Sequence, residues 1–198
     1  MPNKPVKFNI KNAHYAKLNR AAQTGAISFG TPVAVPGSRS ISLDLNGDQE
    51  VFWADGIEYY TDNVNRGYDG DWELAYLDDA FRKAILQEIE DTAGVLFEVQ
   101  ENDEPVEFAF GFQIDGSAHD TRFWFYCCTA TRPKVEGSTT EGSNTPQTDT
   151  LHLKMVGAQV KSGDERHFVR AKCLSTVTGD TYDDWFDEVV LPGTFSTT

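Results

Sequence analysis

The stretch RFWFYCCTATRPKVEGSTTEGSNTPQTDTLHLKM, residues 122–155, joins segments of very different character. Residues 122–132 are dense in aromatic residues, cysteine and threonine, and apolar and polar residues alternate again from Leu151 to Met155. Both patterns are typical of β-strands. Between them, residues 133–149 hold one aliphatic side chain, Val135, and eight Ser, Thr or Gly residues. Loops longer than about 12–15 residues are uncommon in compact domains unless they are functional or disordered. The sequence therefore predicts a polar arm between two strands.

The composition is that of an ordered single domain covering residues 1–198. Of the residues, 39% are hydrophobic and 12% are aromatic, which is enough to build a sizeable core. The start, MPNKPVKFNI, lacks the apolar region of a signal peptide, and no stretch approaches the roughly 20 apolar residues of a membrane span. We expect neither secretion nor membrane insertion.

Three cysteines, Cys127, Cys128 and Cys173, do not make a disulfide framework. Alternation along a strand directs the adjacent pair to opposite faces, so Cys173 could bridge only one of them. The sequence predicts free thiols that pack as small apolar side chains in a reducing cytosol.

The charge is unevenly distributed. The net charge of −14 argues against a protein that grips nucleic acid phosphates. Residues 1–43 contain six basic and no acidic residues, whereas residues 44–79 contain eleven acidic residues and one basic residue. This split is either plain surface solvation or a pair of complementary surfaces that meet head-to-tail between copies.

Strand patterns dominate the chain. We predict strands at 38–45, 51–54, 57–61, 72–76, 95–99, 106–114, 123–131, 150–156 and 168–177. Asx-Gly pairs next to these runs predict turns at Asn46-Gly47, Asp55-Gly56, Asp69-Gly70 and Asp115-Gly116. The acidic, aromatic segment 46–66 does not fit a minimal sandwich and predicts a second extended segment, and a third is expected near residues 1–20.

A single helix is predicted near residues 78–90, capped by Asp78 or Asp79 and stopped at Gly94. The pairs Asp78/Arg82 and Asp79/Lys83 have favourable i,i+4 spacing. Its apolar stripe is predicted to pack on the core through Phe81, Ala84, Ile85 and Ile89. The fold class is therefore mainly β, an antiparallel β-sandwich or barrel with one flanking α-helix.

Motifs for catalysis are missing from the sequence. It contains no phosphate-binding loop, no Gly-x-Ser-x-Gly and no His pair at zinc-ligand spacing, and a calcium loop started at Asp69 has Ala80 where Glu is needed. The carboxylates around Trp185, in Asp183-Asp184 and Asp187-Glu188, are a weak match to a glycosidase pair. We expect no enzymatic activity, no metal and no cofactor.

Two segments carry a resemblance to a known family. NRGYDGDWELAYLDDAFRKAIL (65–86) and YCCTATRPKVEGSTTEGSNTPQTDTL (126–151) resemble the major tail proteins of long-tailed bacteriophages, the tail tube subunits of siphophages. VKFNIKNAHYAKL (6–18) and GAISFGTPVAVPGSRSISLDLNGDQE (25–50) extend the resemblance over nearly the whole chain. A Gly often follows FRKAIL in that family, whereas Gln87 here predicts that the helix continues through Ile89.

The resemblance implies a fold shared with type VI secretion tubes and a homo-hexameric ring that stacks into a tube. It also implies a virion protein of the tail, assembled in the host cytoplasm around a tape measure protein and capped by tail terminator and distal tail or baseplate proteins. An acidic lumen would let phage DNA pass during ejection without specific binding. The residues predicted to make ring and stacking contacts are Lys4, Lys7, Lys11, Asp55, Tyr59, Tyr60, Arg132, Pro133, Glu136, Glu141, Gln147 and Asp149.

A carbohydrate-binding or baseplate-type β-sandwich module of a virion is the alternative. Its sugar-stacking platforms would be Trp53, Tyr59, Tyr60, Trp72, Trp124 and Trp185. A tube subunit should form rings or long polymers, whereas a binding module should stay small.

Overall fold

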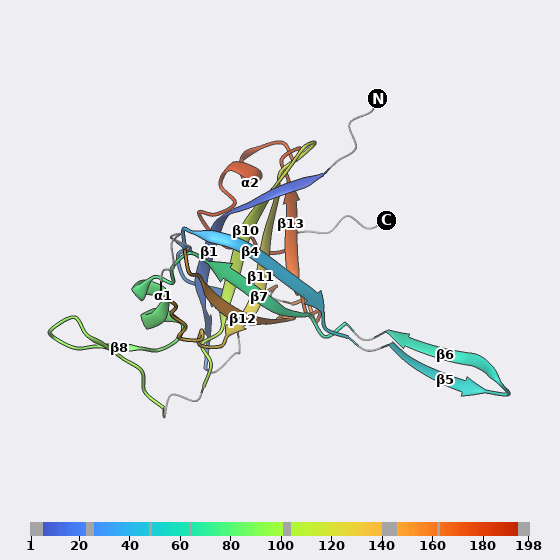
Figure 1. Cartoon of the computed structure of the whole chain (residues 1–198). Coiled ribbons are helices and arrows are strands. Elements are labelled where there is room, and N and C mark those ends of the chain that lie inside the picture. The colour runs from blue at the N-terminus through green and yellow to red at the C-terminus, as the bar shows by residue number, and fades with distance from the viewer. Residues whose placement is uncertain are drawn as a thin grey trace.

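The fold is built on one large antiparallel sheet, shown in Figure 1. The computed structural model describes residues 6–22, 26–47, 49–63, 65–100, 104–139, 146–161 and 163–193. The nine strands of the large sheet are β1 (Lys7–Arg20), β2 (Ile27–Phe29), β3 (Val33–Ala34), β4 (Ser38–Leu45), β7 (Tyr68–Leu74), β10 (Phe108–Gly116), β11 (Thr121–Ala130), β12 (Asp149–Val156) and β13 (Arg170–Leu174). The predicted mainly β, antiparallel fold is confirmed.

The strands of the large sheet follow the order β2-β1-β10-β11-β12-β7-β4, with β13 paired to β11 and β3 paired to β1. Two hairpins stand outside it, formed by β5 (Gln49–Ala54) with β6 (Ile57–Asn63) and by β8 (Ile89–Glu90) with β9 (Leu96–Phe97). The helices are α1 (Asp79–Ala84) and α2 (Asp180–Asp183).

The strand β11 is buried on both faces, which explains its unusual sequence. Six consecutive residues, Phe123–Cys128, are buried. Phe123, Phe125 and Cys128 belong to one apolar cluster, and Trp124, Tyr126 and Cys127 belong to a second. A strand with an apolar cluster on each side has a continuous run of apolar residues in its sequence, whereas a strand with one buried face has an alternating pattern.

A bulge in β11 changes the alternation within this run. Phe108 pairs with Cys128 and Phe110 with Phe125, so two steps along β10 match three along β11. An extra residue in one strand lets two neighbours point to the same side. Tyr126 and Cys127 therefore both face the second cluster, and Cys128 returns to the first.

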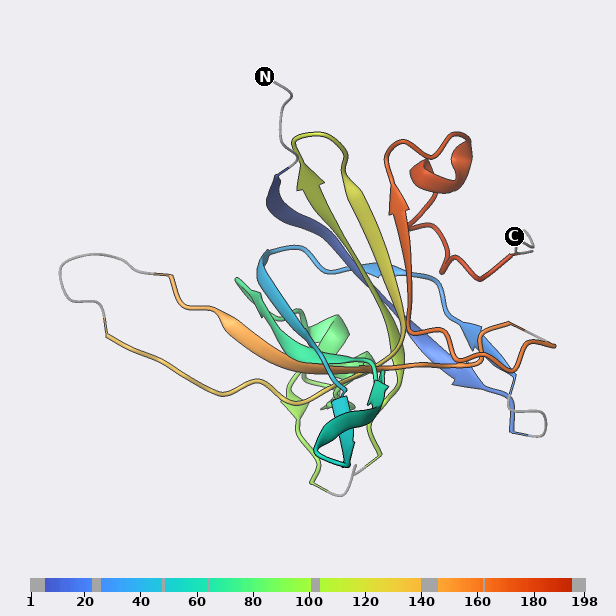
Figure 2. The same cartoon turned by 90° about the vertical axis from the view of Figure 1, so that its right-hand side faces the viewer.

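The sheet divides at the same place. The C-terminal part of β11, Cys127–Ala130, pairs with β12, whereas Thr121–Phe125 pairs with β13. Figure 2 shows β12 in orange and β13 in red leaving β11 in different directions. The first cluster takes side chains from β1, β10, β11, β12 and β7, so the sheet curls around it. The second cluster is covered by Ala158 and Val160 from the segment that follows β12, and by Trp185 and Val189 from the segment that follows α2.

Helix α1 closes the first cluster. Asp78 caps its start by accepting a hydrogen bond from the Ala80 amide at 3.2 Å. Phe81 is fully buried and meets the rings of Tyr15, Trp72 and Phe108 in edge-to-face geometry. Ile85 is buried just after the last turn. Ala84 is half-buried against the same cluster, so the predicted stripe is correct from Phe81 to Ile85.

The prediction was wrong about where this helix ends. It stops at Ala84, and Gln87, expected to continue it, has the left-handed φ of 58°. Ile89 lies in β8 with 55% of its surface exposed, so it is not a core residue. Gly94 sits instead in the β8–β9 turn, at φ 82°. The chain changes direction at Gln87, and the side-chain Nε2 of this residue donates to the Glu104 carbonyl at 2.6 Å.

The Asx-Gly pairs divide into correct and incorrect turn predictions. Asp55 and Gly56 have φ of 53° and 76° and connect β5 to β6, as predicted. Asp69-Gly70 lies inside β7, not in a turn. Asn46-Gly47 ends β4 without making a hairpin, because β4 pairs with β7 and not with β5.

Close backbone approach explains the glycines around β7. A Cβ on Gly67, which has φ of 97°, would lie 1.9 Å from the Met155 carbonyl oxygen. A Cβ on Gly70 would lie 1.9 Å from the Ser42 carbonyl oxygen. These glycines let β7 lie tightly between β12 and β4.

The cysteines are free and buried, as predicted, and the adjacent pair points into different clusters. Burial, with the nearby Glu107 carboxylate as a second cause, raises the pKa of the Cys127 thiol to about 12. Burial also raises the pKa of Cys128 and Cys173. Thiolate is therefore scarce at neutral pH.

We predict that Phe81→Ala lowers the free energy of unfolding by about 3–5 kcal/mol, because it removes a fully buried ring. Ile89→Ala, at the exposed position in β8, should change it by no more than about 0.5 kcal/mol. Denaturant titration of both variants measures the difference, and a loss below about 1 kcal/mol for Phe81→Ala would show that the helix does not close the core.

We also predict that none of the three thiols reacts with a disulfide reagent in the native protein at pH 8. With a pKa of about 12 for Cys127, about one part in ten thousand of that thiol is ionised at this pH. Unfolding in denaturant should release three reactive thiols, counted by absorbance. Rapid reaction of one native thiol would mean that the cluster holding it opens readily.

Candidate assembly surfaces

The β5–β6 hairpin is the first candidate surface. Within the described residues its two strands pair only with each other. It projects well beyond the large sheet in Figure 1. Its base is tied to the sheet where the Asn46 amide donates to the Gly67 carbonyl at 2.8 Å and the Arg66 amide donates to the Asn46 carbonyl at 2.7 Å. The hairpin is thus an insertion between β4 and β7.

Large apolar side chains on this hairpin remain in water. Exposed fractions between 60% and 70% are found at Trp53, Ile57, Tyr59 and Tyr60. Tyr59 and Tyr60 are neighbours in a strand and point to opposite faces, so each face of the hairpin presents an exposed ring. An isolated two-stranded hairpin is marginally stable in water, and exposed apolar patches mark interaction sites. This hairpin has the properties of a segment that packs against another molecule.

The long arm between β11 and β12 is the second candidate surface. Residues 131–139 and 146–148 contain no strand or helix, and Figure 2 shows them extending away from the sheet. The Gln147 amide nitrogen donates to the Ser138 carbonyl at 3.0 Å and to its hydroxyl at 2.8 Å, which links the two sides of the arm. Pro133 is half-buried and Glu136 is exposed. Glu141 lies outside the described residues.

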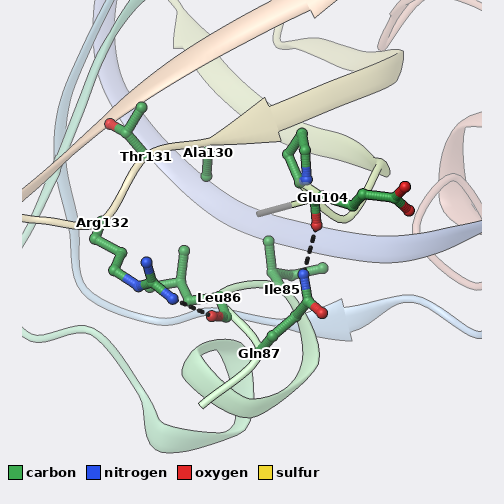
Figure 3. Close-up of a pocket in the computed structure, with 8 residues that line it drawn as sticks. Ile85, Leu86, Gln87, Glu104, Ala130, Thr131 and Arg132 are labelled. Atoms are coloured by element: carbon green, nitrogen blue, oxygen red, sulfur yellow. Dashed lines mark hydrogen bonds between the residues drawn. The ribbon is translucent and has the colours of Figure 1, made fainter. Parts of the chain in front are cut away.

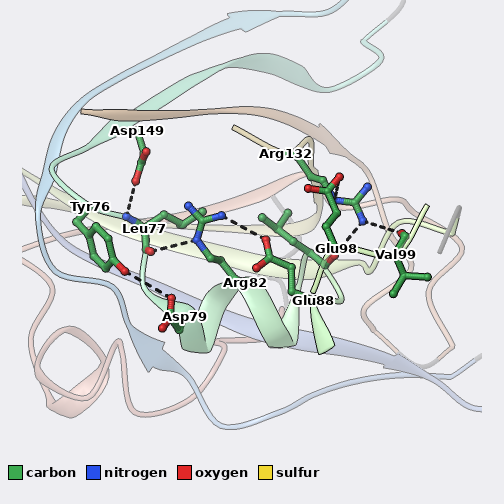
Figure 4. A network of polar contacts seen from close by, with 10 residues as sticks. Tyr76, Leu77, Asp79, Arg82, Glu88, Glu98, Val99, Arg132 and Asp149 are labelled. Carbon is green, nitrogen blue, oxygen red and sulfur yellow. Dashed lines mark hydrogen bonds and ion pairs between the residues drawn. The ribbon is translucent and has the colours of Figure 1, made fainter. Parts of the chain in front are cut away.

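The base of this arm is fixed to the rest of the domain by residues that we predicted to contact neighbours. Figure 4 shows that Arg132 contacts the Glu98 carboxylate at 3.3 Å and donates to the Val99 carbonyl at 3.4 Å. The Asp149 carboxylate accepts from the Leu77 amide at 2.8 Å, just before α1. Arg132 and Asp149 therefore anchor the arm within the subunit.

A polar group on β7 also holds the arm. The Glu73 carboxylate accepts hydrogen bonds from the Thr148 hydroxyl at 2.6 Å, from Arg39 at 2.6 Å and from the Ser40 hydroxyl at 2.9 Å. These contacts, that of Thr148 first, lower the pKa of Glu73. The carboxylate thus stays ionised and joins the arm to β4 and β7.

A shallow pocket of about 300 Å³ opens beside the base of the arm (Figure 3). Ile85 and Leu86 form its apolar wall, and Ala130 and Thr131 lie opposite. On one wall the Arg132 side chain donates to the Leu86 carbonyl at 3.4 Å. The pocket connects the end of α1 to the arm and carries no arrangement of groups that points to catalysis.

The basic N-terminal part of the chain is partly paired within the subunit. Lys11 contacts Asp115 at 2.9 Å, Arg20 contacts Glu107 at 2.6 Å, and Arg39 contacts Glu73 at 2.6 Å. Lys7 and Lys17 are exposed, and Lys4 lies outside the described residues. The cationic surface offered to a neighbour is therefore smaller than the sequence predicted.

Three of the six proposed sugar platforms are inside the protein. Trp72 and Trp124 are fully buried and Trp185 is 3% exposed, so the prediction was wrong for them. Trp53, Tyr59 and Tyr60 remain exposed on the β5–β6 hairpin. The carboxylates of Asp183, Asp184, Asp187 and Glu188 are exposed around the buried Trp185.

Within the part of the chain that the structure describes, no group of three or more His, Cys, Asp or Glu side chains is arranged to hold a metal ion. No helix in the same part is long and apolar enough to cross a membrane.

The β8–β9 hairpin is an exposed apolar element that the sequence analysis assigned in part to the helix. Its exposed side chains are Ile89, Val95 and Phe97. Asp91 and Gly94, between Ile89 and Val95, were the available turn signal, but we read Gly94 as the stop of a longer helix.

Comparisons with known proteins do not assign this chain to a family. No protein-family model matches the chain, and no curated protein matches it. Among solved structures, a chain in the cryo-EM structure of the anti-feeding prophage (AFP) baseplate, 6-fold symmetrised, is similar with a TM-score of 0.43 and 11% sequence identity, over 87% of this chain and 97% of that chain. At this level of similarity, neither the fold family nor the function of this protein follows from the match.

We predict that Asp149→Ala lowers the free energy of unfolding by about 1–3 kcal/mol, because it leaves the partly buried Leu77 amide without its acceptor. Glu136→Ala, on the exposed part of the arm, should have an effect within about 0.5 kcal/mol. Denaturant titration distinguishes the two. If Asp149→Ala kept parental stability but failed to assemble, Asp149 would belong to a subunit contact instead.

Proposed function

We propose that the protein is a structural subunit of a phage tail, which polymerises with itself into stacked hexameric rings that form the tail tube. The observation that carries this proposal is the exposure of Trp53, Ile57, Tyr59 and Tyr60 on the β5–β6 hairpin, with Tyr59 and Tyr60 on opposite faces. The resemblance of residues 65–86 and 126–151 to major tail proteins supports the same function.

The energetics of the hairpin favour assembly through many contacts. Burying one large apolar side chain contributes about 1.5–3 kcal/mol, so the four on this hairpin contribute about 6–12 kcal/mol. Association itself costs about 4–15 kcal/mol. A single hairpin contact is therefore near balance, and a stable assembly needs several contacts for each subunit. Stacked rings provide such contacts.

The charge is compatible with a conduit for DNA. The net charge of −14 repels phosphates, so a lumen lined by this protein would let the genome slide without specific binding. In this proposal the protein acts without catalysis and without a cofactor. It resides in the virion tail, is assembled in the host cytoplasm around a tape measure protein, and meets tail terminator and distal tail or baseplate proteins at the tube ends.

A carbohydrate-binding or baseplate-type module remains the second candidate, because Trp53, Tyr59 and Tyr60 present exposed rings on one hairpin. Aromatic rings that pack on sugars need the same exposure. The two candidates differ in particle size and in glycan binding.

We predict that the triple variant Trp53→Ser/Tyr59→Ser/Tyr60→Ser folds normally but no longer forms rings or tubes. The substitutions remove apolar surface that contacts nothing in the subunit core, so the unfolding transition should stay within about 0.5 kcal/mol for each. Negative-stain electron microscopy and sedimentation at high concentration measure assembly.

The matched control is Tyr76→Ser, which removes an equally exposed tyrosine, at 64%, outside the hairpin. It should assemble like the parent. A parent protein that stays monomeric at high concentration and shifts on a glycan array would contradict the tube proposal and favour the binding module.

A further inference from the structure

The β8–β9 hairpin presents a small, preorganised apolar platform. Ile89 and Phe97 are directly opposed in the ladder, and Val95 is two residues before Phe97, so the three side chains share one face. The turn between the strands is built by Asp91, whose carboxylate accepts from the amides of Ala93 at 2.8 Å and Val95 at 2.9 Å. We call Ile89, Val95 and Phe97 the platform.

Three carboxylates around the platform are matched by cations of the same subunit, and the Asp91 carboxylate is bound by the amides of the turn. Glu88 contacts Arg82 at 3.2 Å, Glu90 contacts Lys83 at 2.7 Å, and Glu98 contacts Arg132 at 3.3 Å. Figure 4 shows the first and third of these pairs beside α1. Arg82 and Lys83 thus make their close ion pairs with the hairpin. The Glu90 carboxylate is the main cause that raises the pKa of Lys83, and the charges of Asp79, its predicted partner, and of Asp78 add to it.

These pairs make the platform receptive to an acidic partner. Like charges brought together across an interface are unfavourable, and these three pairs reduce the repulsion that an acidic partner meets beside the platform. Lys83 and Arg132 keep 41% and 33% of their side-chain surface exposed, so each has donors that a second carboxylate can reach.

The β5–β6 hairpin has the complementary chemistry. Residues 49–63 contain four acidic residues and no Lys or Arg. Asp55 and Glu58 are exposed beside Trp53, Ile57 and Tyr59. Pairing this hairpin with a copy of itself would bring these carboxylates together without a cation. Pairing it with the platform brings them to Lys83 and Arg132.

The two hairpins lie on opposite sides of the subunit. Figure 1 shows β5 and β6 projecting to one side of the large sheet and β8 to the other. A subunit that carries a surface and its complement on opposite sides associates head-to-tail, which generates a closed ring or an open filament.

We propose that the platform of one copy receives the β5–β6 hairpin of a second copy, with Lys83 and Arg132 donating hydrogen bonds to its carboxylates and Ile89, Val95 and Phe97 packing against its aromatic rings. This inference rests on the proposed function, self-assembly, and adds which two surfaces of the chain meet.

The test uses two variants that each lack one surface. The hairpin variant is Trp53→Ser/Tyr59→Ser/Tyr60→Ser, and the platform variant is Ile89→Ser/Val95→Ser/Phe97→Ser. Neither should polymerise alone, and circular dichroism and unfolding titrations should show that both fold. Mixed in equal amounts they retain one intact hairpin and one intact platform, so we expect a heterodimer and no larger species by sedimentation.

Cross-linking detects the same contact when it is weak. A chain with Tyr59→Cys mixed with a chain with Phe97→Cys should form an intermolecular disulfide under mild oxidation, at least about tenfold faster than either chain alone. Tyr76→Cys replaces Tyr59→Cys as the control and should not cross-link to Phe97→Cys. Adding Lys83→Glu should slow the productive cross-link several-fold at low salt and less at high salt, because surface charges are screened over about 8–10 Å at physiological salt.

The outcomes separate this inference from the proposed function. If the parent forms tubes and the platform variant forms them equally well, the platform contact is wrong and the tube proposal stands. The same holds if Tyr59→Cys cross-links to itself as fast as to Phe97→Cys, since the contact would then be symmetric. If the parent forms no polymer, the tube proposal fails, and the absence of the mixed cross-link would overturn the platform contact as well.

Discussion

Burial of β11 on both faces is the constraint on which the rest of the fold depends. Each apolar cluster needs side chains from this strand, and each must be covered by another part of the chain. The first is enclosed by the curled sheet and α1. The second is covered in part by residues outside the strands, and polar donors on β11 hold this cover in place. Trp124 donates to the Trp185 carbonyl and Tyr126 to the Val190 carbonyl, both at 2.8 Å, and Arg122 donates to the Tyr182 carbonyl. These donors alternate along the strand, so one face of β11 fastens a segment that has little regular structure of its own. Gly111 makes room for this arrangement, since a Cβ there would lie 2.8 Å from the Trp124 ring.

The projecting elements are insertions between strands and helices that belong to this core. The β5–β6 hairpin connects β4 to β7, the β8–β9 hairpin connects α1 to β10, and the polar arm connects β11 to β12. Each is fastened at its base by hydrogen bonds or ion pairs, while the side chains that it exposes contribute little to the core. Stability and the proposed assembly therefore depend on different residues. Because of this division, the amino-acid sequence of the surface segments can vary without unfolding the domain.

The sequence predicted the parts of this structure that follow from local pattern. The alternation of residues 38–45 and the Asp55-Gly56 turn are local, and the structure has both.

β1 was not predicted as a 14-residue strand because its alternation is broken by register shifts and by Asn12, which has φ of 53°. The helix was extended too far because a favourable apolar spacing continues to Ile89, whereas the left-handed φ of Gln87 and its hydrogen bond to the Glu104 carbonyl belong to a chain that has already left the helix. The exposed hairpin 49–63 was predicted as an extended segment from its composition. The roles of Arg132 and Asp149 could not be, because their partners at Glu98 and Leu77 are distant in sequence.

Net charge sets a condition on any association between copies of this chain. A charge of −14 makes two subunits repel each other at long range, and salt screens this repulsion over about 8–10 Å. Attraction must then come from short-range contacts placed where the local charge is low. The surroundings of the β8–β9 hairpin come closer to that condition because Glu88, Glu90 and Glu98 each lie next to a cation of the same subunit. Surface ion pairs contribute only about 0–1 kcal/mol each to stability, so these three add little to the fold. Their larger effect is on the surface itself. They lower the charge around an apolar platform, and on a strongly acidic protein this makes the platform a place where an acidic, aromatic segment can pack.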